Sequence, residues 1–182
     1  MTAGPVEHET GYALPIGTLE DARAMVGRRT PPRVATAPVS WGRIQQFCAM
    51  TRDGNPSYWD AQFARATWGE VVAPPAMVEA WLMPLEWSPS SPEPEPRIMA
   101  RIPLPGRSMI NGGNDTTFHR PVVVGDTLTV EEELLSVSDL KSTRLGDGHF
   151  VETLSVFRNQ RGEVVADVRN TLFRFEPRAE PA

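Results

Sequence analysis

Three polar side chains, two of them able to exchange a proton, stand close together at a predicted turn. Asp53, Asn55 and Tyr58 belong to the stretch Asp-Gly-Asn-Pro-Ser-Tyr, which begins with four turn-forming residues. The carboxylate of Asp53 is able to bind and activate a water, but in such a turn it also accepts backbone hydrogen bonds, so both roles stay open. His119, beside a predicted strand, is the histidine best placed to reach a pocket. These residues indicate acid–base chemistry.

The composition excludes several other classes of function. The 182 residues are 40% hydrophobic and 23% charged, which predicts one globular domain. The single cysteine, Cys48, has no partner for an internal disulfide, and no Cys/His spacing indicates a metal site. The net charge of −5 and the scattered arginines argue against nucleic acid. Without a long apolar run or a basic leader, we expect no membrane contact and a cytoplasmic location.

The elements that must position these residues begin with helices. Capping residues and helical spacing of apolar side chains predict helices over residues 19–26, 41–50 and 61–68. Their capping residues are Thr18, Ser40 and Asp60. Residues 76–83 are apolar nearly all round, which is typical of a helix buried against a sheet.

Strands are predicted in the second half of the chain. They cover residues 118–124, 128–137, 150–157 and 164–175. Helices first and strands second favour an α+β domain with an antiparallel sheet. We expect this domain over 18–176, between a flexible tail at 1–17 and a short tail at 177–182. Nine prolines between Pro74 and Pro105 predict a Pro-rich insertion around 84–105.

Three stretches of this sequence resemble MaoC-like dehydratases and (R)-specific enoyl-CoA hydratases. They are residues 47–60 with the Asp-Gly-Asn-Pro turn, residues 72–77 with the sequence Val-Ala-Pro-Pro-Ala-Met, and residues 120–128. The second is similar to the N-terminal, FAS1-like dehydratase branch of that family. The resemblance implies a hotdog fold, in which a curved antiparallel sheet wraps around a central hydrophobic helix, here 76–83. It also implies acyl-CoA or acyl-carrier-protein thioesters as ligands, and no cofactor.

The resemblance is partial at the catalytic motif. Catalytic members carry Asp-x-Asn-Pro-x-His, in which aspartate and histidine activate the water that adds to a trans-2-enoyl thioester. Asp53, Asn55 and Pro56 match this motif, but Tyr58 stands in the place of the histidine. A tyrosine, with a pKa of about 10, rarely serves as a general base.

A second part of the machinery also departs from the family. Catalytic members use a backbone N–H at the start of the central helix to polarise the thioester carbonyl. Pro74 and Pro75 lie near that place and have no N–H to donate. Unless Ala76 is the matching residue, this chain lacks that donor as well.

Three functions therefore stay open. The chain is the non-catalytic, pocket-forming subunit of a heteromeric hydratase or dehydratase, whose second MaoC-like subunit carries Asp and His. Alternatively it is a self-sufficient hydratase, as a homodimer, that uses Asp53 with Tyr58 or His119, or a hotdog that binds an acyl thioester without catalysis. In each case the expected substrate-binding residues are Trp59, Pro75, Ala76, Met77 and Trp81, since methionine and flat aromatic side chains suit long apolar ligands.

Overall fold

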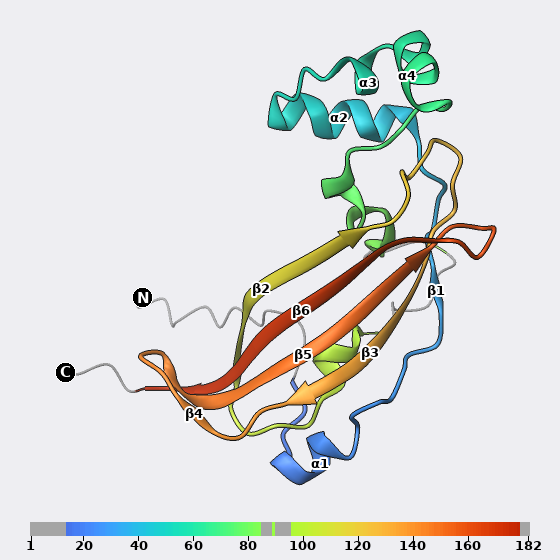
Figure 1. The fold of residues 1–182 in the computed structure, drawn as a ribbon. Coiled ribbons are helices and arrows are strands. Elements are labelled where there is room, and N and C mark those ends of the chain that lie inside the picture. The colour runs from blue at the N-terminus through green and yellow to red at the C-terminus, as the bar shows by residue number, and fades with distance from the viewer. Residues whose placement is uncertain (1–13, 85–88, 90–95, 179–182) are drawn as a thin grey trace.

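An antiparallel sheet forms the body of the computed structural model, which describes residues 14–84, 89 and 96–178 (Figure 1). Its strand order is β1-β3-β5-β6-β2, and β4 pairs with β5 at one end. The strands are β1 (Arg33–Val34), β2 (Ser108–Phe118), β3 (Thr129–Val137), β4 (Lys141–Ser142), β5 (Gly146–Arg158) and β6 (Val164–Pro177). The predicted α+β class with an antiparallel sheet is confirmed.

The strand predicted at 118–124 is wrong. The strand in this region is β2, which ends at Phe118 and pairs with β6 from Ser108↔Phe175 to Phe118↔Ala166. After Phe118 the chain leaves the sheet, because Pro121 has no N–H for a ladder and Val123 makes only an isolated bridge to Val72. The edge of the sheet is thus a polar strand.

Four α-helices lie beyond the two ends of the sheet (Figure 1). They are α1 (Leu19–Arg23), α2 (Trp41–Thr51), α3 (Pro56–Trp59) and α4 (Ala61–Trp68). Thr18 caps α1 and Asp60 caps α4 through their side chains, as predicted, whereas Ser40 makes no side-chain cap bond. α1 ends at Arg23, three residues before the predicted end. No helix in the described ranges is long and apolar enough to cross a bilayer.

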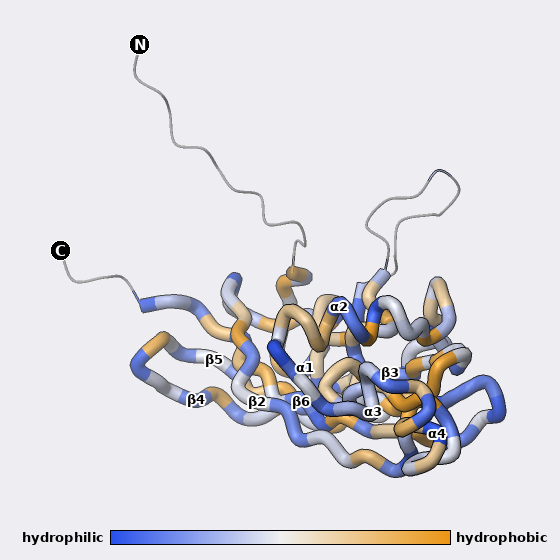
Figure 2. The backbone as a smooth tube through the Cα atoms, turned by 90° about the horizontal axis from the view of Figure 1, so that it is seen from above, coloured by the Kyte–Doolittle hydropathy of each residue, from blue (hydrophilic) through white to orange (hydrophobic). Residues whose placement is uncertain are grey.

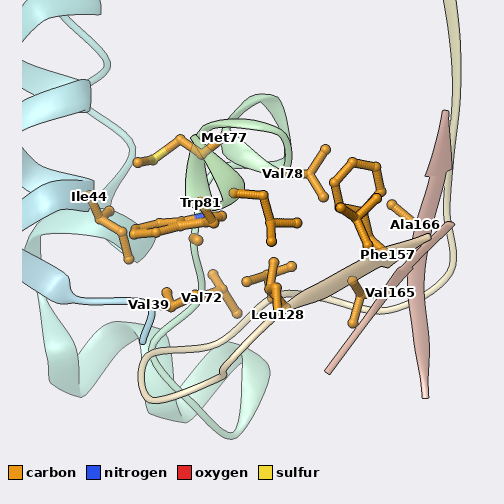
Figure 3. Packing of buried hydrophobic residues seen from close by; sticks show 14 of the residues in the cluster. Val39, Ile44, Val72, Met77, Val78, Trp81, Leu128, Phe157, Val165 and Ala166 are labelled. Carbon is orange, nitrogen blue, oxygen red and sulfur yellow. The ribbon is translucent and has the colours of Figure 1, made fainter. Parts of the chain in front are cut away.

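The central segment is not the continuous helix predicted over 76–83. It forms two 3-10 turns, η1 (Pro75–Met77) and η2 (Ala80–Leu82). The backbone N–H groups of Val78 and Leu82 bond the carbonyl oxygens of Pro75 and Glu79, three residues back instead of four, and Pro84 favours the extended conformation that Met83 adopts. Trp81 is nevertheless buried, and Figure 3 shows its ring beside Ile44 of α2.

A second core cluster lies under the later part of the predicted insertion. Ile98 in η3 (Ile98–Arg101), Ile102 and Leu104 are buried with Ala22 of α1 and Leu134 of β3. This part of the 84–105 segment is therefore packed, while residues 85–88 and 90–95 lie outside the described residues, as do 1–13 and 179–182 of the predicted tails. Figure 2 shows hydrophilic stretches at the periphery, including the ends of the sheet.

Candidate functional site

The Asp-Gly-Asn-Pro segment forms a tight turn between α2 and α3. Arg52 ends α2 in the left-handed conformation, with φ of 56°. Oδ1 of Asp53 then accepts the N–H of Asn55 at 3.0 Å, and Oδ1 of Asn55 accepts the N–H of Ser57 at 3.0 Å, which caps α3. The carbonyl of Asp53 accepts the indole N–H of Trp59 at 2.7 Å. Asp53 thus stabilises its own turn.

Tyr58 is buried next to this turn and lines a cavity of about 260 Å³. Burial raises the pKa of Tyr58, and the neighbouring Asp53 and Cys48 raise it further. The phenol therefore keeps its proton at neutral pH. Its oxygen is able to hold a water, but it cannot accept the proton that water must lose.

His119 lines the same cavity as Tyr58, and so the structure brings together two predicted site residues. The Nε2 atom of His119 lies 2.5 Å from Oδ2 of Asp167 on β6, and its backbone N–H bonds the carbonyl of Val165 at 2.9 Å. Asp53 does not line this cavity. The imidazole of His119 is directed to Asp167, so one nitrogen is already occupied.

Two further features concern titratable and metal-binding groups. His149 on β5 is buried, and its Nδ1 lies 3.0 Å from the carbonyl oxygen of Ser138. Within residues 14–84, 89 and 96–178, no cluster of His, Cys, Asp and Glu is arranged to hold a metal ion. Neither feature adds a catalytic group to the cavity of Tyr58.

The start of η1 separates two cavities. Pro75 lines the smaller one and Ala76 lines a larger one of about 580 Å³. The N–H of Ala76 donates no hydrogen bond to any described residue, and Ala76 is exposed. Because Pro74 and Pro75 have no N–H, Ala76 carries the first backbone donor of this segment that is free to bind a carbonyl oxygen.

The other predicted binding residues lie away from both cavities. Met77 and Trp81 belong to the main core cluster, and Trp59 is on the exposed side of α3. Of the predicted binding residues, Pro75 and Ala76 each line one of these two cavities. The apolar run at 76–83 contributes to both the core and the cavity, because Met77 and Trp81 lie in the main core cluster, whereas Met83 is 68% exposed and lines the larger cavity.

The larger cavity lies between the η1–η2 segment, the η3 segment and the sheet. Its wall is mainly apolar, and includes Leu82, Met83, Met99, Met109, Val130 and Phe157. A volume of about 580 Å³ falls within the range of about 300–1,000 Å³ that is usual for ligand pockets. Flexible methionines suit an irregular apolar ligand.

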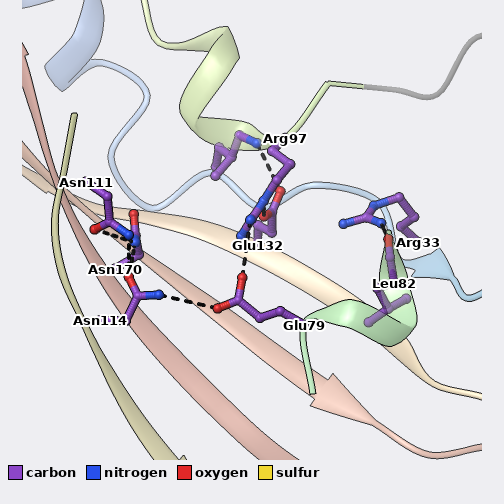
Figure 4. Close-up of polar contacts among 9 residues, drawn as sticks. Arg33, Glu79, Leu82, Arg97, Asn111, Asn114, Glu132 and Asn170 are labelled. Carbon is purple, nitrogen blue, oxygen red and sulfur yellow. Dashed lines mark hydrogen bonds and ion pairs between the residues drawn. The ribbon is translucent and has the colours of Figure 1, made fainter. Parts of the chain in front are cut away.

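Sequence reasoning missed four charged residues of this cavity: Arg33, Glu79, Arg97 and Glu132. The signal was present for Glu132. It stands two residues after Val130 and two before Leu134 on β3. Since every second residue of a strand faces the same side, Glu132 must face the buried side of the sheet with them. Figure 4 shows how these side chains lie around η2 and η3.

The fold and this pair of cavities define the class of the protein. A curved antiparallel sheet around a short central helical segment is the hotdog fold, which solved MaoC-like dehydratases share. The chain belongs to the family described as "FAS1-like, dehydratase domain region", whose model matches residues 24–168. The family suggested by the sequence motifs is thereby confirmed.

Two relatives and one solved structure bear names that refer to subunits. A probable enoyl-CoA hydratase alpha subunit of Thermomonospora curvata is 40% identical over 163 residues, which are 86% of this chain and 51% of the relative. The 3-oxo-4,17-pregnadiene-20-carboxyl-CoA hydratase alpha subunit of Mycobacterium tuberculosis is 29% identical over 172 residues, which are 92% of this chain and 55% of the relative. This chain spans about half the length of these relatives.

The solved structure is the ChsH1-ChsH2 complex from Mycobacterium tuberculosis. Its matching chain has a TM-score of 0.70 and 26% identity to this protein, over 89% of this chain and 91% of that chain. The likeness extends to a chain that was crystallised in a complex of two named proteins.

Proposed function

We propose that this chain is the pocket-forming subunit of a heteromeric enoyl-CoA hydratase. It binds the acyl thioester and a second MaoC-like subunit, and the second subunit contributes the Asp/His pair that activates water. The observation that carries the proposal is the environment of Tyr58. A buried, protonated phenol occupies the place of the motif histidine, and Asp53, the acidic residue of the same motif, does not line its cavity.

Hydration requires a base at the position where water is bound. The base takes a proton from water while the water oxygen forms a bond to the β-carbon of the enoyl thioester. Negative charge then collects on the thioester oxygen until the α-carbon receives a proton, so a hydrogen-bond donor must lie beside that oxygen. In our proposal the free N–H of Ala76 is such a donor on this chain, and the base comes from the partner.

The outer strand β2 is the surface that we assign to the partner. Almost all of its residues are exposed, and its outer edge has no neighbouring strand in the described structure. Edge strands present unpaired N–H and C=O groups to another chain. Ile110 and Phe118 are 41% and 50% exposed on β2, and Phe118 also lines the cavity of Tyr58. A partner at this edge would lie close to that cavity.

The comparisons support this proposal without naming the substrate of this chain. One relative is called an enoyl-CoA hydratase alpha subunit, and the other takes its name from a thioester with a 3-oxo-pregnadiene body. The cavity of about 580 Å³ is compatible with a bulky ring system as well as with a folded chain. We therefore propose that the substrates are enoyl-CoA thioesters whose acyl group is bulky and apolar.

One observation favours a self-sufficient hydratase as the second candidate. Tyr58 and His119 line one cavity, and Nε2 of His119 lies 2.5 Å from Oδ2 of Asp167, a contact that orients the imidazole ring. In that case His119 would act as the base, and no second subunit would be needed. A hotdog that binds thioesters without catalysis is the third candidate.

The test is hydration of an enoyl-CoA by the purified chain, by the partner that co-purifies with it, and by their mixture. Loss of absorbance of the conjugated double bond reports turnover. The proposal expects no turnover with this chain alone and turnover with the mixture. Full turnover by this chain alone would select the self-sufficient hydratase, whereas thioester binding with no partner and no turnover would select the binding protein.

A further inference from the structure

Four charged side chains line the larger cavity within the described residues, and three of them satisfy one another. Nε of Arg97 donates to Oε1 of Glu132 at 2.7 Å, and Nη1 of Arg97 lies 3.3 Å from Oε2 of Glu79 (Figure 4). The second oxygen of Glu132 accepts the N–H of Ile98 at 3.0 Å. The second oxygen of Glu79 accepts from Asn114 at 3.4 Å. Their hydrogen-bonding capacity is therefore largely used.

Arg33 is the exception. Its guanidinium donates through Nη1 to the carbonyl oxygen of Leu82 at the end of η2, and no other described residue accepts a hydrogen bond from it. A guanidinium has five N–H donors, so most of those of Arg33 have no protein acceptor. Arg33 is partly buried, so its guanidinium has lost part of its water, and this burial lowers its pKa. An acceptor from a ligand would replace that water.

The charges around the cavity decide which kind of acceptor fits. Arg33 and Arg97 carry two positive charges, and Glu79 and Glu132 carry two negative charges, so the wall is neutral as a whole. A carboxylate or phosphate would bring an uncompensated charge into a mainly apolar space, which costs free energy. A ketone or hydroxyl oxygen accepts a hydrogen bond without that cost. A cavity that offers hydrogen-bond donors but no net charge therefore favours a ligand with a neutral polar group on an apolar body.

We infer that Arg33 is a specificity-determining residue that donates a hydrogen bond to a neutral acceptor, such as a ring ketone, on the apolar body of the bound acyl group. This inference rests on the proposed function, since it places the acyl group in the cavity that begins at Ala76. Ala76 and Leu82 lie at the two ends of the η1–η2 segment, and both line that cavity. A ligand with its thioester at Ala76 extends along η2 to Arg33.

The test compares two neutral steroid probes that differ in one atom group. The first is 5α-androstan-3-one, and the second is 5α-androstane, in which a methylene group replaces the 3-oxo group and no other acceptor is present. Binding of each to the full chain is measured by quenching of tryptophan fluorescence, with equilibrium dialysis as a second readout. The variant is Arg33→Met, which keeps the apolar stem and removes the donors. Arg65→Met, on the exposed face of α4, is the matched control.

The expected result is a preference for the ketone by about tenfold or more in the unaltered chain, the size of one charge-assisted hydrogen bond. Arg33→Met should remove the preference and leave binding of the methylene analogue unchanged, and Arg33→Lys should restore part of it. Equal binding of the two probes by the unaltered chain, or a preference that survives Arg33→Met, overturns the inference. If neither probe binds, the inference also fails, while hydration by the mixed subunits still tests the proposed function separately.

Discussion

Replacing Arg97 by methionine should destabilise the fold by leaving a buried carboxylate without its charged partner. The side chain of Glu132 is 5% exposed on β3, and its two oxygens accept from Nε of Arg97 and from the N–H of Ile98. The substitution Arg97→Met keeps the length and the apolar stem of residue 97. It removes only the guanidinium, and so it isolates the electrostatic part of the contact.

The size of the stability loss caused by Arg97→Met follows from the burial of Arg97 and Glu132. Breaking a fully buried ion pair by removing one partner costs about 3–5 kcal/mol. Since 39% of the Arg97 side chain is exposed, water can partly replace the guanidinium, and the expected loss is reduced to about 2 kcal/mol. For a domain of this size that loss lowers Tm by roughly 4–8 °C. Adding Glu132→Gln should recover about half of the loss, because the buried charge is removed as well.

Urea unfolding followed by tryptophan fluorescence measures all members of this double-mutant cycle. The exposed ion pair of Arg23 and Asp139 provides the control, because Arg23→Met should cost less than about 1 kcal/mol. The reasoning is refuted if Arg97→Met costs no more than Arg23→Met. It is also refuted if Glu132→Gln destabilises the Arg97→Met chain further.

Three further predictions concern the Thr18 cap of α1, the thiol of Cys48 and the exposed edge strand β2. Thr18→Ala removes the capping box with Asp21 and should lower the free energy of unfolding, measured in urea, by about 1 kcal/mol. An unchanged urea midpoint would contradict this prediction. Burial raises the pKa of Cys48, so the thiol loses its proton at lower pH in the unfolded chain than in the folded one. Stability should therefore fall as the pH rises above about 8.5, the pKa of a free thiol. In urea unfolding between pH 7.5 and 9.5, Cys48→Ala should flatten this decline, and parallel declines would exclude the thiol as its source. Ile110→Asp on β2 should weaken assembly with the second subunit by about tenfold or more in analytical ultracentrifugation. Leu140→Asp, also at an exposed apolar residue, should not, and equal effects would argue against β2 as the interface.

The elements with strong local signals could be predicted from the sequence. Asp60 caps α4 as predicted, and Gly69 ends it in the left-handed conformation, because a side-chain cap and a left-handed glycine are local properties. The long strands β5 and β6 also follow from alternation of apolar residues. The predicted hotdog fold needed the family motifs in addition, because local patterns do not specify how a sheet closes around its central segment.

The elements that depend on tertiary context were not predicted. The β2 stretch Ser108–Phe118 contains Asn-Gly-Gly-Asn-Asp, which resembles a loop, and it is a strand only because β6 pairs with it. The 76–83 segment has the composition of a buried helix, but its bonded N–H groups reach carbonyl oxygens three residues back in two 3-10 turns, which an apolar pattern alone does not distinguish from an α-helix. Of the site, the turn at Asp53 followed from motif reasoning, whereas the cavity that Tyr58 and His119 share did not, because the two residues come from segments far apart in the chain. Arg33 and Arg97 did not follow either, because they reach the larger cavity from segments far apart in the chain.

The central claim is that this chain contributes no proton acceptor to catalysis. The most direct measurement is the rate of enoyl-CoA hydration by the assembled enzyme in which this chain carries both Asp53→Asn and His119→Ala. We predict a kcat within about threefold of the unaltered enzyme, since a general base contributes about 10²–10⁴-fold and none is removed. A fall of a hundredfold or more, with the two subunits still assembled, would contradict the account.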